Sequence, residues 1–554
     1  MSDAADIRFR GTQPKPASDE GAPSTPAIER VSQDSKVPSS PPGSPSSPLK
    51  RSTSWERAIS GASDMAGRVY NPGEVRVRLD MLKDWMRVMK ARWMGLIYRL
   101  ALLCFLVQLA PRAWSLWIVR DEVKQAQLGQ LGDVISRSDV MALVPALCVA
   151  LTSFLLKRRN RSVYLLDFAL FKAPEEWKVS KAQIVEMMRN AGKGERSFDE
   201  DDLKFMEKIL ANSGTGDATA WPPGIIRCLE PGVRQDQSME AARKEADTVI
   251  CSCLQDLFDA TGIKPKQVDF LIINCSLFSP TPSLCAMAAN KFKMRMNVRT
   301  YNLSGMGCSA SLLAVDLASE LLQNNPNSIA VVVSTELITQ SLYHGHLKGM
   351  LLQNTLFRCG GAAICLTNKS SLVGRAKYRL RHLVRTQATN DESYNCVYQC
   401  QDETGQGGVR LSKDIVRVAG DAMKRNLTEL GPLVLPIHEQ ARVAYYLLRN
   451  KLVKHGTTMK YVPNFKSAFD YFCIHAGGRA VLDGIEKSLR LHKSDLEASR
   501  SVLHDYGNTS SSSIWYELRY IERHKPLRRG HSILQLAFGS GFKCNSACWT
   551  RLRS

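Results

Sequence analysis

The stretch Phe472-Cys-Ile-His475, followed by Gly507-Asn-Thr-Ser-Ser511, decides how this chain folds, because it repeats a pattern that occurs two hundred residues earlier. The earlier copy has a strand that ends at Asn274-Cys275 and a turn at Gly307-Cys-Ser-Ala-Ser311. In both copies 33 residues separate the strand end from the second residue of a turn that opens a helix. Two similar halves at this spacing predict a duplicated fold whose halves pack about a pseudo-twofold axis.

Around these two segments, apolar runs alternate with helical patterns from about Ser162 onward, as is typical of a layered α/β body. Short buried strands are expected at Asp269–Asn274, Ile329–Ser334, Gly361–Leu366, Phe472–His475 and Ile533–Ala537. Helices are expected at Ala310–Leu322 and Ser511–Ile521. The sequence therefore predicts an α/β body with an N-terminal half at residues 162–370 and a C-terminal half at residues 371–554.

The duplication has a chemical consequence, because symmetry would bring the two helix starts and the ends of the two strands into one pocket. Cys308, His475 and Asn508 would then lie together. A cysteine at a helix N-terminus beside a histidine is expected to have a lowered pKa, which makes it a nucleophile for acyl transfer. Gly305 and Gly307 remove side chains around Cys308, so that a bulky thioester could reach backbone N–H groups.

The residues before this body predict two further regions. Residues 1–75 form a tail too poor in apolar groups to fold, and Ser35 to Lys50 alone contains six Ser and five Pro. Residues 76–161 are expected to form a membrane hairpin with helices at about 93–110 and 140–156. Basic clusters outside this pair predict that both flanks, and hence the α/β body, face the cytosol.

Composition limits the class of protein and of partner. Hydrophobic residues at 44% and charged residues at 23% exclude a fully disordered chain, a collagen and a polytopic transporter. The excess of 74 Lys and Arg over 53 Asp and Glu favours anionic partners, among them CoA and an acidic membrane, and no nucleic-acid motif is present. Fifteen cysteines without small-domain spacing indicate reduced thiols in a cytosol-facing protein.

At these positions the sequence resembles the plant-type 3-ketoacyl-CoA synthases, the membrane-bound condensing enzymes of very-long-chain fatty acid elongation. The resemblance covers roughly residues 160–554, and the hairpin also fits it. The matching strings are Tyr301-Asn-Leu-Ser-Gly-Met-Gly-Cys-Ser-Ala310, Leu356-Phe-Arg-Cys-Gly-Gly-Ala-Ala363, Phe472-Cys-Ile-His-Ala-Gly-Gly-Arg-Ala-Val481, Tyr506-Gly-Asn-Thr-Ser-Ser-Ser-Ser513 and Phe538-Gly-Ser-Gly-Phe-Lys-Cys-Asn545.

The resemblance implies a thiolase-like fold of two βαβαβαββ halves, usually dimeric, and a decarboxylating condensation. Cys308 would take the acyl group from a long-chain acyl-CoA, and His475 and Asn508 would hold the thioester oxygen of malonyl-CoA while carbon dioxide leaves. Gly539, Ser540 and Gly541 are candidates for a second oxyanion site, by analogy with related enzymes. Because decarboxylation supplies the carbanion, no metal or redox cofactor is expected beyond the CoA thioester substrates.

The same resemblance implies the setting of the enzyme. It places the chain in the endoplasmic reticulum membrane with its catalytic body facing the cytosol. It implies association with a ketoacyl-CoA reductase, a dehydratase and an enoyl-CoA reductase.

The sequence departs from the family at two positions. Members usually have histidine where this chain has Gln387, and commonly have histidine four residues before the catalytic one, where this chain has Tyr471. Neither side chain can transfer a proton near neutral pH as histidine does. We expect activity to survive, because the set of Cys308, His475 and Asn508 is complete.

Other readings remain open beside this one. A type III polyketide synthase-like or a soluble priming ketoacyl-carrier-protein synthase would lack the hairpin. A degradative thiolase would carry a second cysteine beside the loop at Gly539, and a catalytically weak scaffold of an elongase complex would not need Cys308. His344 and His346 have no metal-ligand spacing to a carboxylate or cysteine, so no metal site is predicted. The pairs Cys396/Cys400 and Cys544/Cys548 are expected to be ordinary thiols.

Overall fold

The structure is a computed structural model that describes residues 161–191, 198–452 and 461–553. The predicted tail at 1–75 and the predicted hairpin at 76–161 lie outside the described residues, apart from Arg161. None of the helices in these three described ranges is long and apolar enough to span a bilayer.

Thirteen strands and fourteen α-helices are assigned within these ranges, together with short 3-10 turns. The strands are β1 (Tyr164–Leu170), β2 (Lys178–Val179), β3 (Thr219–Ala220), β4 (Phe270–Asn274), β5 (Arg299–Leu303), β6 (Ile329–Glu336), β7 (Gly360–Thr367), β8 (Tyr378–Gln387), β9 (Val397–Gln401), β10 (Gly407–Leu411), β11 (Tyr471–Ile474), β12 (Ser532–Gly539) and β13 (Lys543–Arg551). The helices are α5 (Lys181–Asn190), α6 (Glu200–Asn212), α7 (Pro223–Ile226), α8 (Met239–Thr261), α9 (Leu284–Lys291), α10 (Ala310–Asn324), α11 (Lys348–Leu356), α12 (Ser370–Val373), α13 (Asp391–Tyr394), α14 (Ile415–Val434), α15 (Ile437–Leu452), α16 (Arg479–Leu489), α17 (Glu497–Tyr506) and α18 (Ser513–His524). Two 3-10 turns matter for the site, η7 (Gly307–Ser309) and η10 (Ser510–Ser512).

The main sheet has nine strands, and its order confirms the duplication. The order is β11-β12-β13-β8-β1-β7-β6-β4-β5. From the centre outward, β1, β7, β6 and β4 in one half match β8, β13, β12 and β11 in the other. In each half the outer pair is parallel and the inner pairs are antiparallel, and β1 and β8 pair with each other where the halves meet. Among the nine strands of this sheet, β5 alone has no counterpart in the other half.

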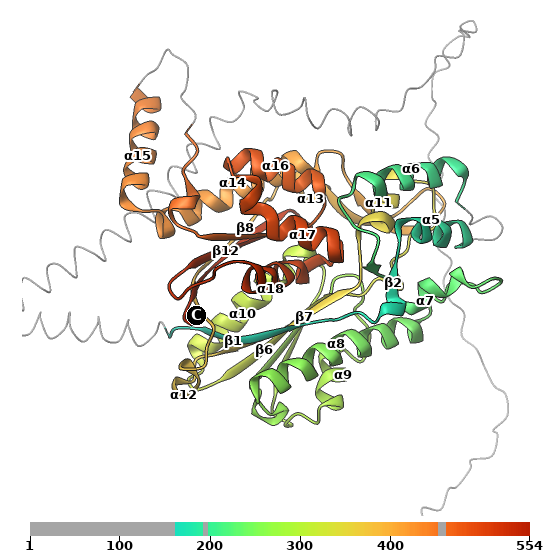
Figure 1. Ribbon diagram of the computed structural model, residues 1–554, viewed down its shortest axis with the longest axis horizontal. Helices are drawn as coiled ribbons and strands as arrows, with labels where there is room; N and C mark the ends of the chain where they lie inside the picture. The colour runs from blue at the N-terminus through green and yellow to red at the C-terminus, as the bar shows by residue number, and fades with distance from the viewer. Residues whose placement is uncertain (1–160, 192–197, 453–460, 554) are drawn as a thin grey trace, which may run out of the picture. The chain divides into compact units, whose positions relative to one another are not determined.

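Helices cover the sheet in three layers (Figure 1). Helix α8 packs on β1 and β7, and α14 packs on β8 and β13. Between the two half-sheets lie α10 and α18, because α10 contacts β4 and β6 of one half as well as β8 and β13 of the other. Their buried residues form one core with both half-sheets, and a separate core fills each outer face. The two central helices are the ones whose first residues follow Cys308 and Asn508.

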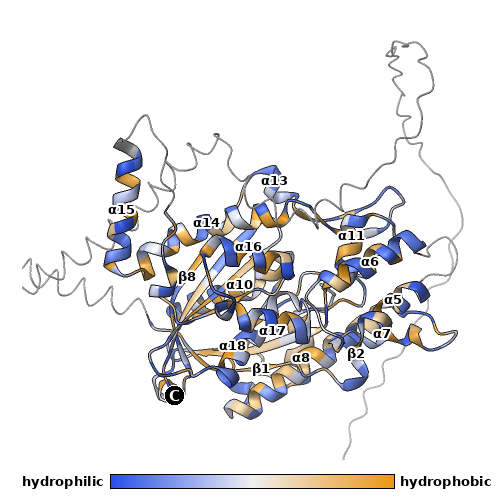
Figure 2. Ribbon diagram, turned by 45° about the horizontal axis from the view of Figure 1, so that its top comes forward, coloured by the Kyte–Doolittle hydropathy of each residue, from blue (hydrophilic) through white to orange (hydrophobic). Residues whose placement is uncertain are grey.

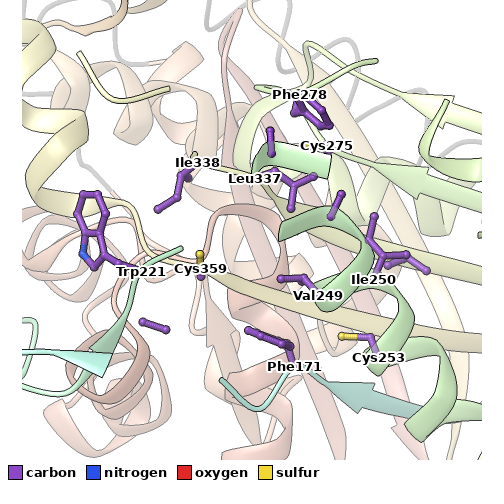
Figure 3. Close-up of a cluster of buried hydrophobic side chains, with 14 of the residues drawn as sticks. Phe171, Trp221, Val249, Ile250, Cys253, Cys275, Phe278, Leu337, Ile338 and Cys359 are labelled. Carbon is purple, nitrogen blue, oxygen red and sulfur yellow. The ribbon is translucent and has the colours of Figure 1, made fainter. Parts of the chain in front are cut away.

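The central strands form because most of their residues are apolar or small, as in Ile329-Ala-Val-Val-Val333 of β6. All eight residues of β6 and all eight of β7 are buried, as expected for strands covered on both faces. A fully buried Val or Ile contributes roughly 1.5–3 kcal/mol relative to an exposed one. Figure 3 shows part of the outer core of the first half, where Cys253 of α8 lies beside Phe171, and Val249 lies nearer to Leu337, which follows β6.

The five strands and two helices expected from the sequence are all present, each within two residues of its expected start. The boundary expected at residue 370 falls between β7 and β8, at the start of α12. The nine strands form one continuous sheet, which does not mark a boundary between two domains. The division of the chain at residue 370 therefore stays a prediction.

Candidate active site

Cys308 lies in the turn η7, which runs directly into α10. Its side chain is half-buried, and the Ser510 hydroxyl lies 3.5 Å from the Cys308 sulfur. The Gly307 N–H donates to the Ser276 hydroxyl at 3.0 Å, which ties the turn to the end of β4. Gly307 has a φ of +62°, a conformation that glycine adopts without a Cβ penalty. The expected helix-start position of Cys308 is therefore present.

The glycine loop at Gly539–Gly541 packs against this turn. A Cβ built on Gly307 would lie 2.7 Å from the Ser540 backbone nitrogen and 3.3 Å from the Gly539 Cα. A Cβ on Gly539 would in turn meet the Ser309 hydroxyl and the Met306 carbonyl. Both glycines are thus required by close backbone approach, and the structure brings the predicted loop next to Cys308.

His475 directly follows β11, and its backbone N–H donates to the Leu536 carbonyl at 2.9 Å, so β12 fixes its position. The Nδ1 atom hydrogen-bonds the Ser513 hydroxyl at 2.8 Å. The side chain is buried, and burial lowers its pKa to about 4. The imidazole is therefore neutral at physiological pH, and its Nε2 atom can serve as a neutral donor if Nδ1 accepts the hydroxyl proton of Ser513.

Asn508 lies in the turn between α17 and η10. Its backbone N–H donates to the Leu356 carbonyl at 3.2 Å. The side-chain oxygen accepts from the Ser510 N–H at 2.9 Å, an Asx-type turn, and Nδ2 donates to the Gly477 carbonyl at 3.3 Å. The amide therefore helps to shape the turn and also reaches the loop that follows His475. One of its two Nδ2 hydrogens is left for another acceptor.

A buried hydrogen-bond network fixes the two turns relative to each other. Asn274 Nδ2 donates to the Ser511 hydroxyl at 2.7 Å, and the Ser334 hydroxyl donates to Asn274 Oδ1 at 2.8 Å. Ser311 accepts from the Trp515 indole at 2.6 Å and lies 2.8 Å from Ser334. These bonds join residues of both halves at the centre of the fold. Satisfied networks of this kind specify one packing arrangement, because breaking them leaves buried polar groups unpaired.

Two residues beside Cys308 were not foreseen from the sequence. Ser510 has a φ of +54°, and its hydroxyl also lies 2.9 Å from a carboxylate oxygen of Glu336, the buried last residue of β6. The other oxygen of Glu336 accepts from the Ser276 and Leu277 N–H groups, each at 2.7 Å. Burial raises the pKa of Glu336. The signal available in the sequence was an acidic residue at the end of an otherwise buried strand.

The expected lowering of the Cys308 pKa is not found. Burial is the largest influence and raises the pKa of the thiol to about 12, and the charge of Glu336 acts in the same direction. His475 is neutral and so supplies no positive charge that would lower this pKa. Cys308 is therefore a thiol in this state, and its sulfur lies 3.5 Å from the Ser510 hydroxyl.

Comparison with known proteins identifies the family. The family model described as FAE1/Type III polyketide synthase-like protein matches residues 155–452, and that of the chalcone and stilbene synthases, C-terminal domain, matches residues 446–548. The chain is 45% identical to 3-ketoacyl-CoA synthase 4 of Arabidopsis thaliana over 504 residues, which cover 89% of this chain and 95% of that protein. It is 50% identical to 3-ketoacyl-CoA synthase 5 of the same plant over 71% of this chain and 78% of that protein.

The chain belongs to the 3-ketoacyl-CoA synthase family. The resemblance seen in the sequence is thereby confirmed. With it are confirmed the enzyme class, a condensing acyltransferase, and the function in very-long-chain fatty acid elongation.

Solved structures confirm the thiolase-like fold of this synthase. The crystal structure of a fungal type III polyketide synthase, ORAS, matches with a TM-score of 0.55 at 16% identity, over 70% of this chain and 99% of that one. CsyB complexed with CoA-SH matches with a TM-score of 0.54 at 19% identity, over 70% of this chain and all of that one. At these identities the likeness concerns the fold alone.

The two positions at which this synthase departs from its family lie at different distances from the site. Tyr471 opens β11, and its hydroxyl donates to the Pro526 carbonyl at 3.3 Å. Four residues of strand, about 13 Å, separate it from His475. Gln387 ends β8 in register with Lys543, just after the glycine loop, and its side chain is exposed. The structure therefore places Tyr471 at the opposite end of β11 from His475, and Gln387 nearer to the glycine loop.

The possible metal ligands of this synthase lie elsewhere. His346 Nδ1 lies 2.5 Å from a carboxylate oxygen of Asp202, and one ligand atom from each of Asp199, Asp202 and His346 falls within 4.8 Å of the others. Sequence spacing did not reveal this cluster, because the carboxylates come from the start of α6. The ion pair between His346 and Asp202 explains why these two side chains lie together without a metal ion. The expectation that the protein has no metal site stays a prediction. Every described cysteine is a free thiol.

Proposed function

We propose that this chain condenses a long-chain acyl-CoA with malonyl-CoA to a 3-ketoacyl-CoA, through an acyl group carried on Cys308. One observation supports the assignment of Cys308, His475 and Asn508 to this reaction. The segment at residues 508–513 lies against Cys308 through Ser510 and bonds His475 through Ser513, and it contains Asn508. A nucleophile and two neutral hydrogen-bond donors are thus held by one segment.

In the first step the Cys308 sulfur attacks the thioester carbonyl of acyl-CoA. The new carbon–sulfur bond replaces the bond to CoA, which leaves as its thiol with the proton that Cys308 gives up. Because burial holds the pKa of Cys308 at about 12, this proton must leave as the sulfur attacks. Ser510 is the hydroxyl in contact with the sulfur, and Glu336 is its other partner. Backbone N–H groups of the loop at Gly539–Gly541 are candidates to stabilise the oxyanion.

In the second step malonyl-CoA loses carbon dioxide, and the electron pair of the broken bond becomes an enolate. His475 Nε2 and Asn508 Nδ2 are donors for the thioester oxygen on which the negative charge develops. Neutral donors in a buried site stabilise such a charge by several kcal/mol, and removing one typically costs about 100- to 1,000-fold in rate. The enolate carbon then attacks the acyl group on Cys308 and releases the sulfur as a thiolate, which takes up one proton from solvent to restore the thiol.

The setting of the reaction is part of the same proposal. The substrates are a long-chain acyl-CoA and malonyl-CoA, with no further cofactor, and the excess of basic residues suits their phosphates. We place the chain at the endoplasmic reticulum membrane, anchored by residues 76–161 with its body in the cytosol. Partners would be a second copy of the chain and the reductase, dehydratase and enoyl reductase that process a 3-ketoacyl-CoA.

The experiment is an assay of microsomes that carry the full chain, with radiolabelled malonyl-CoA and a series of acyl-CoA primers. The wild type is expected to give acyl chains two carbons longer, and Cys308→Ala is expected to lose this product entirely. Cys400→Ala is the matched control, since Cys400 lies in β9, away from the site. Condensation that persists in Cys308→Ala would overturn the assignment. Several successive additions with ring closure would instead favour a polyketide synthase, and no product from any primer would favour the scaffold.

A further inference from the structure

Helix α15 carries large apolar side chains that the body of the protein does not cover. Ile437, Tyr445 and Leu448 are 63%, 61% and 58% exposed. At 100° per residue these three fall within about 80° of one another around the helix, together with the small residues Ala441 and Ala444. The chain therefore presents one continuous apolar face on this helix.

The opposite side of α15 packs against the segment that begins at Tyr461. Glu439 is buried and accepts from the Tyr461 hydroxyl at 2.6 Å and from the Asn464 N–H at 3.1 Å. The Tyr446 ring stacks on Tyr461 with centroids 4.6 Å apart. Because Glu439 and Tyr446 fix this side, the apolar face must point away from the core. In Figures 1 and 2 α15 projects from the nine-stranded sheet, and Figure 2 shows both hydrophobic and hydrophilic residues along it.

The charge beside the apolar face has one sign. Arg442 and Arg449 flank it at about 60° from Tyr445 or less. The acidic residue of the helix, Glu439, is on the attached side and pairs with Arg442 at 2.7 Å. The sequence from residue 440 to residue 469 contains six Lys or Arg and no Asp or Glu. An exposed apolar face bordered by cations is the pattern of a helix that lies in the interface of an anionic bilayer.

We propose that α15 docks the catalytic body on the surface of an anionic membrane, with Ile437, Tyr445 and Leu448 inserted among the lipids. Arg449 then lies at the level of the headgroups. This docking rests on the proposed membrane placement of the chain and adds a second contact to it, next to the body that handles long acyl chains. Long-chain acyl-CoA partitions into membranes, so a docked body takes its substrate from the phase in which that substrate resides.

Photocrosslinking in the full chain tests the occupant of this face. A benzophenone amino acid replaces Leu448, and the chain is bound to vesicles of phosphatidylcholine with or without phosphatidylserine. The matched control carries the same group at Met296, which is fully exposed in the connection between α9 and β5. Adducts are separated by mass into those with lipid, with a second copy, and within the chain.

The proposal predicts lipid adducts from position 448 and not from position 296, with a higher yield on phosphatidylserine. Arg449→Gln is expected to lower that yield about fivefold, the effect of one cation near an anionic surface. Adducts with a second copy, adducts with residues before 161, or equal yields at the two positions would each overturn it. A chain that binds vesicles without lipid adducts at 448 refutes only the docking, whereas a chain that does not bind vesicles refutes the membrane placement as well.

Discussion

Glu336 should control the protonation of the proposed nucleophile, and Glu336→Gln tests this. The carboxylate lies next to Ser510, which lies next to the Cys308 sulfur, and its negative charge disfavours the thiolate. A glutamine has nearly the same shape and can still accept from the Ser276 and Leu277 N–H groups. The substitution therefore removes the charge with little change in packing.

The magnitude follows from the geometry. The two contacts through Ser510, at 2.9 and 3.5 Å, place the carboxylate oxygen within roughly 6 Å of the Cys308 sulfur. With an effective dielectric constant of about 20, two unit charges at that separation interact by about 2.8 kcal/mol, which is about two pKa units. Glu336→Gln should thus lower the pKa of Cys308 from about 12 by about two units.

The assay is the rate of alkylation of Cys308 by iodoacetamide against pH, read by mass spectrometry of the peptide that contains it. Below both pKa values the thiolate fraction rises by about 100-fold for two units, but the thiolate also becomes less nucleophilic. The net expectation is alkylation about tenfold faster in the variant. Glu245→Gln is the matched control, because Glu245 is an equally buried glutamate whose cysteine partner is Cys359 at 3.1 Å.

Two results would refute the reasoning. One is alkylation of Cys308 that is unchanged or slower in a Glu336→Gln protein whose melting temperature stays close to that of the wild type. The other is the same acceleration in Glu245→Gln, since that would trace the effect to loosened packing and not to the charge.

Further predictions concern pH, backbone and the departures from the family. Burial lowers the pKa of His475 to about 4, so the unfolded chain takes up a proton near its ordinary pKa while the folded chain does not. The free energy of unfolding should have its full value above pH 6.5 and fall by up to about 3 kcal/mol as the pH is lowered toward 4. Denaturant titration should show a smaller fall in His475→Gln. Gly307→Ala should lower both the activity and the melting temperature more than Gly305→Ala does. Both glycines have a positive φ, but only at Gly307 would the added Cβ lie 2.7 Å from a backbone atom, the nitrogen of Ser540. Equal melting temperatures of the two variants would contradict this. Tyr471→His should change the condensation rate less than about twofold, as expected for a residue outside the site, and a large gain would show that the lost histidine acts in the reaction.

The duplicated sheet could be predicted because its signals are local. The run Ile329–Val333 is apolar at every position, and four of its five residues are β-branched, so it is a strong signal for a buried strand. The equal spacing of Cys308 and Asn508 from the ends of the preceding strands then indicates which helix starts correspond. Strands β1, β8 and β13 were not anticipated, since their mixed sequences gain strand structure only through their neighbours in the sheet.

What the sequence determined by itself was the family, the duplicated α/β fold and the positions of Cys308, His475 and Asn508, because motifs of adjacent residues encode them. Only the tertiary structure decided that Ser510 lies between Cys308 and Glu336 and that the pKa of the Cys308 thiol is raised. It also decided that Tyr471 lies away from the site. The physical reason is that burial and charge at a site depend on groups brought together from distant segments, and the spacing of residues along one segment does not contain them.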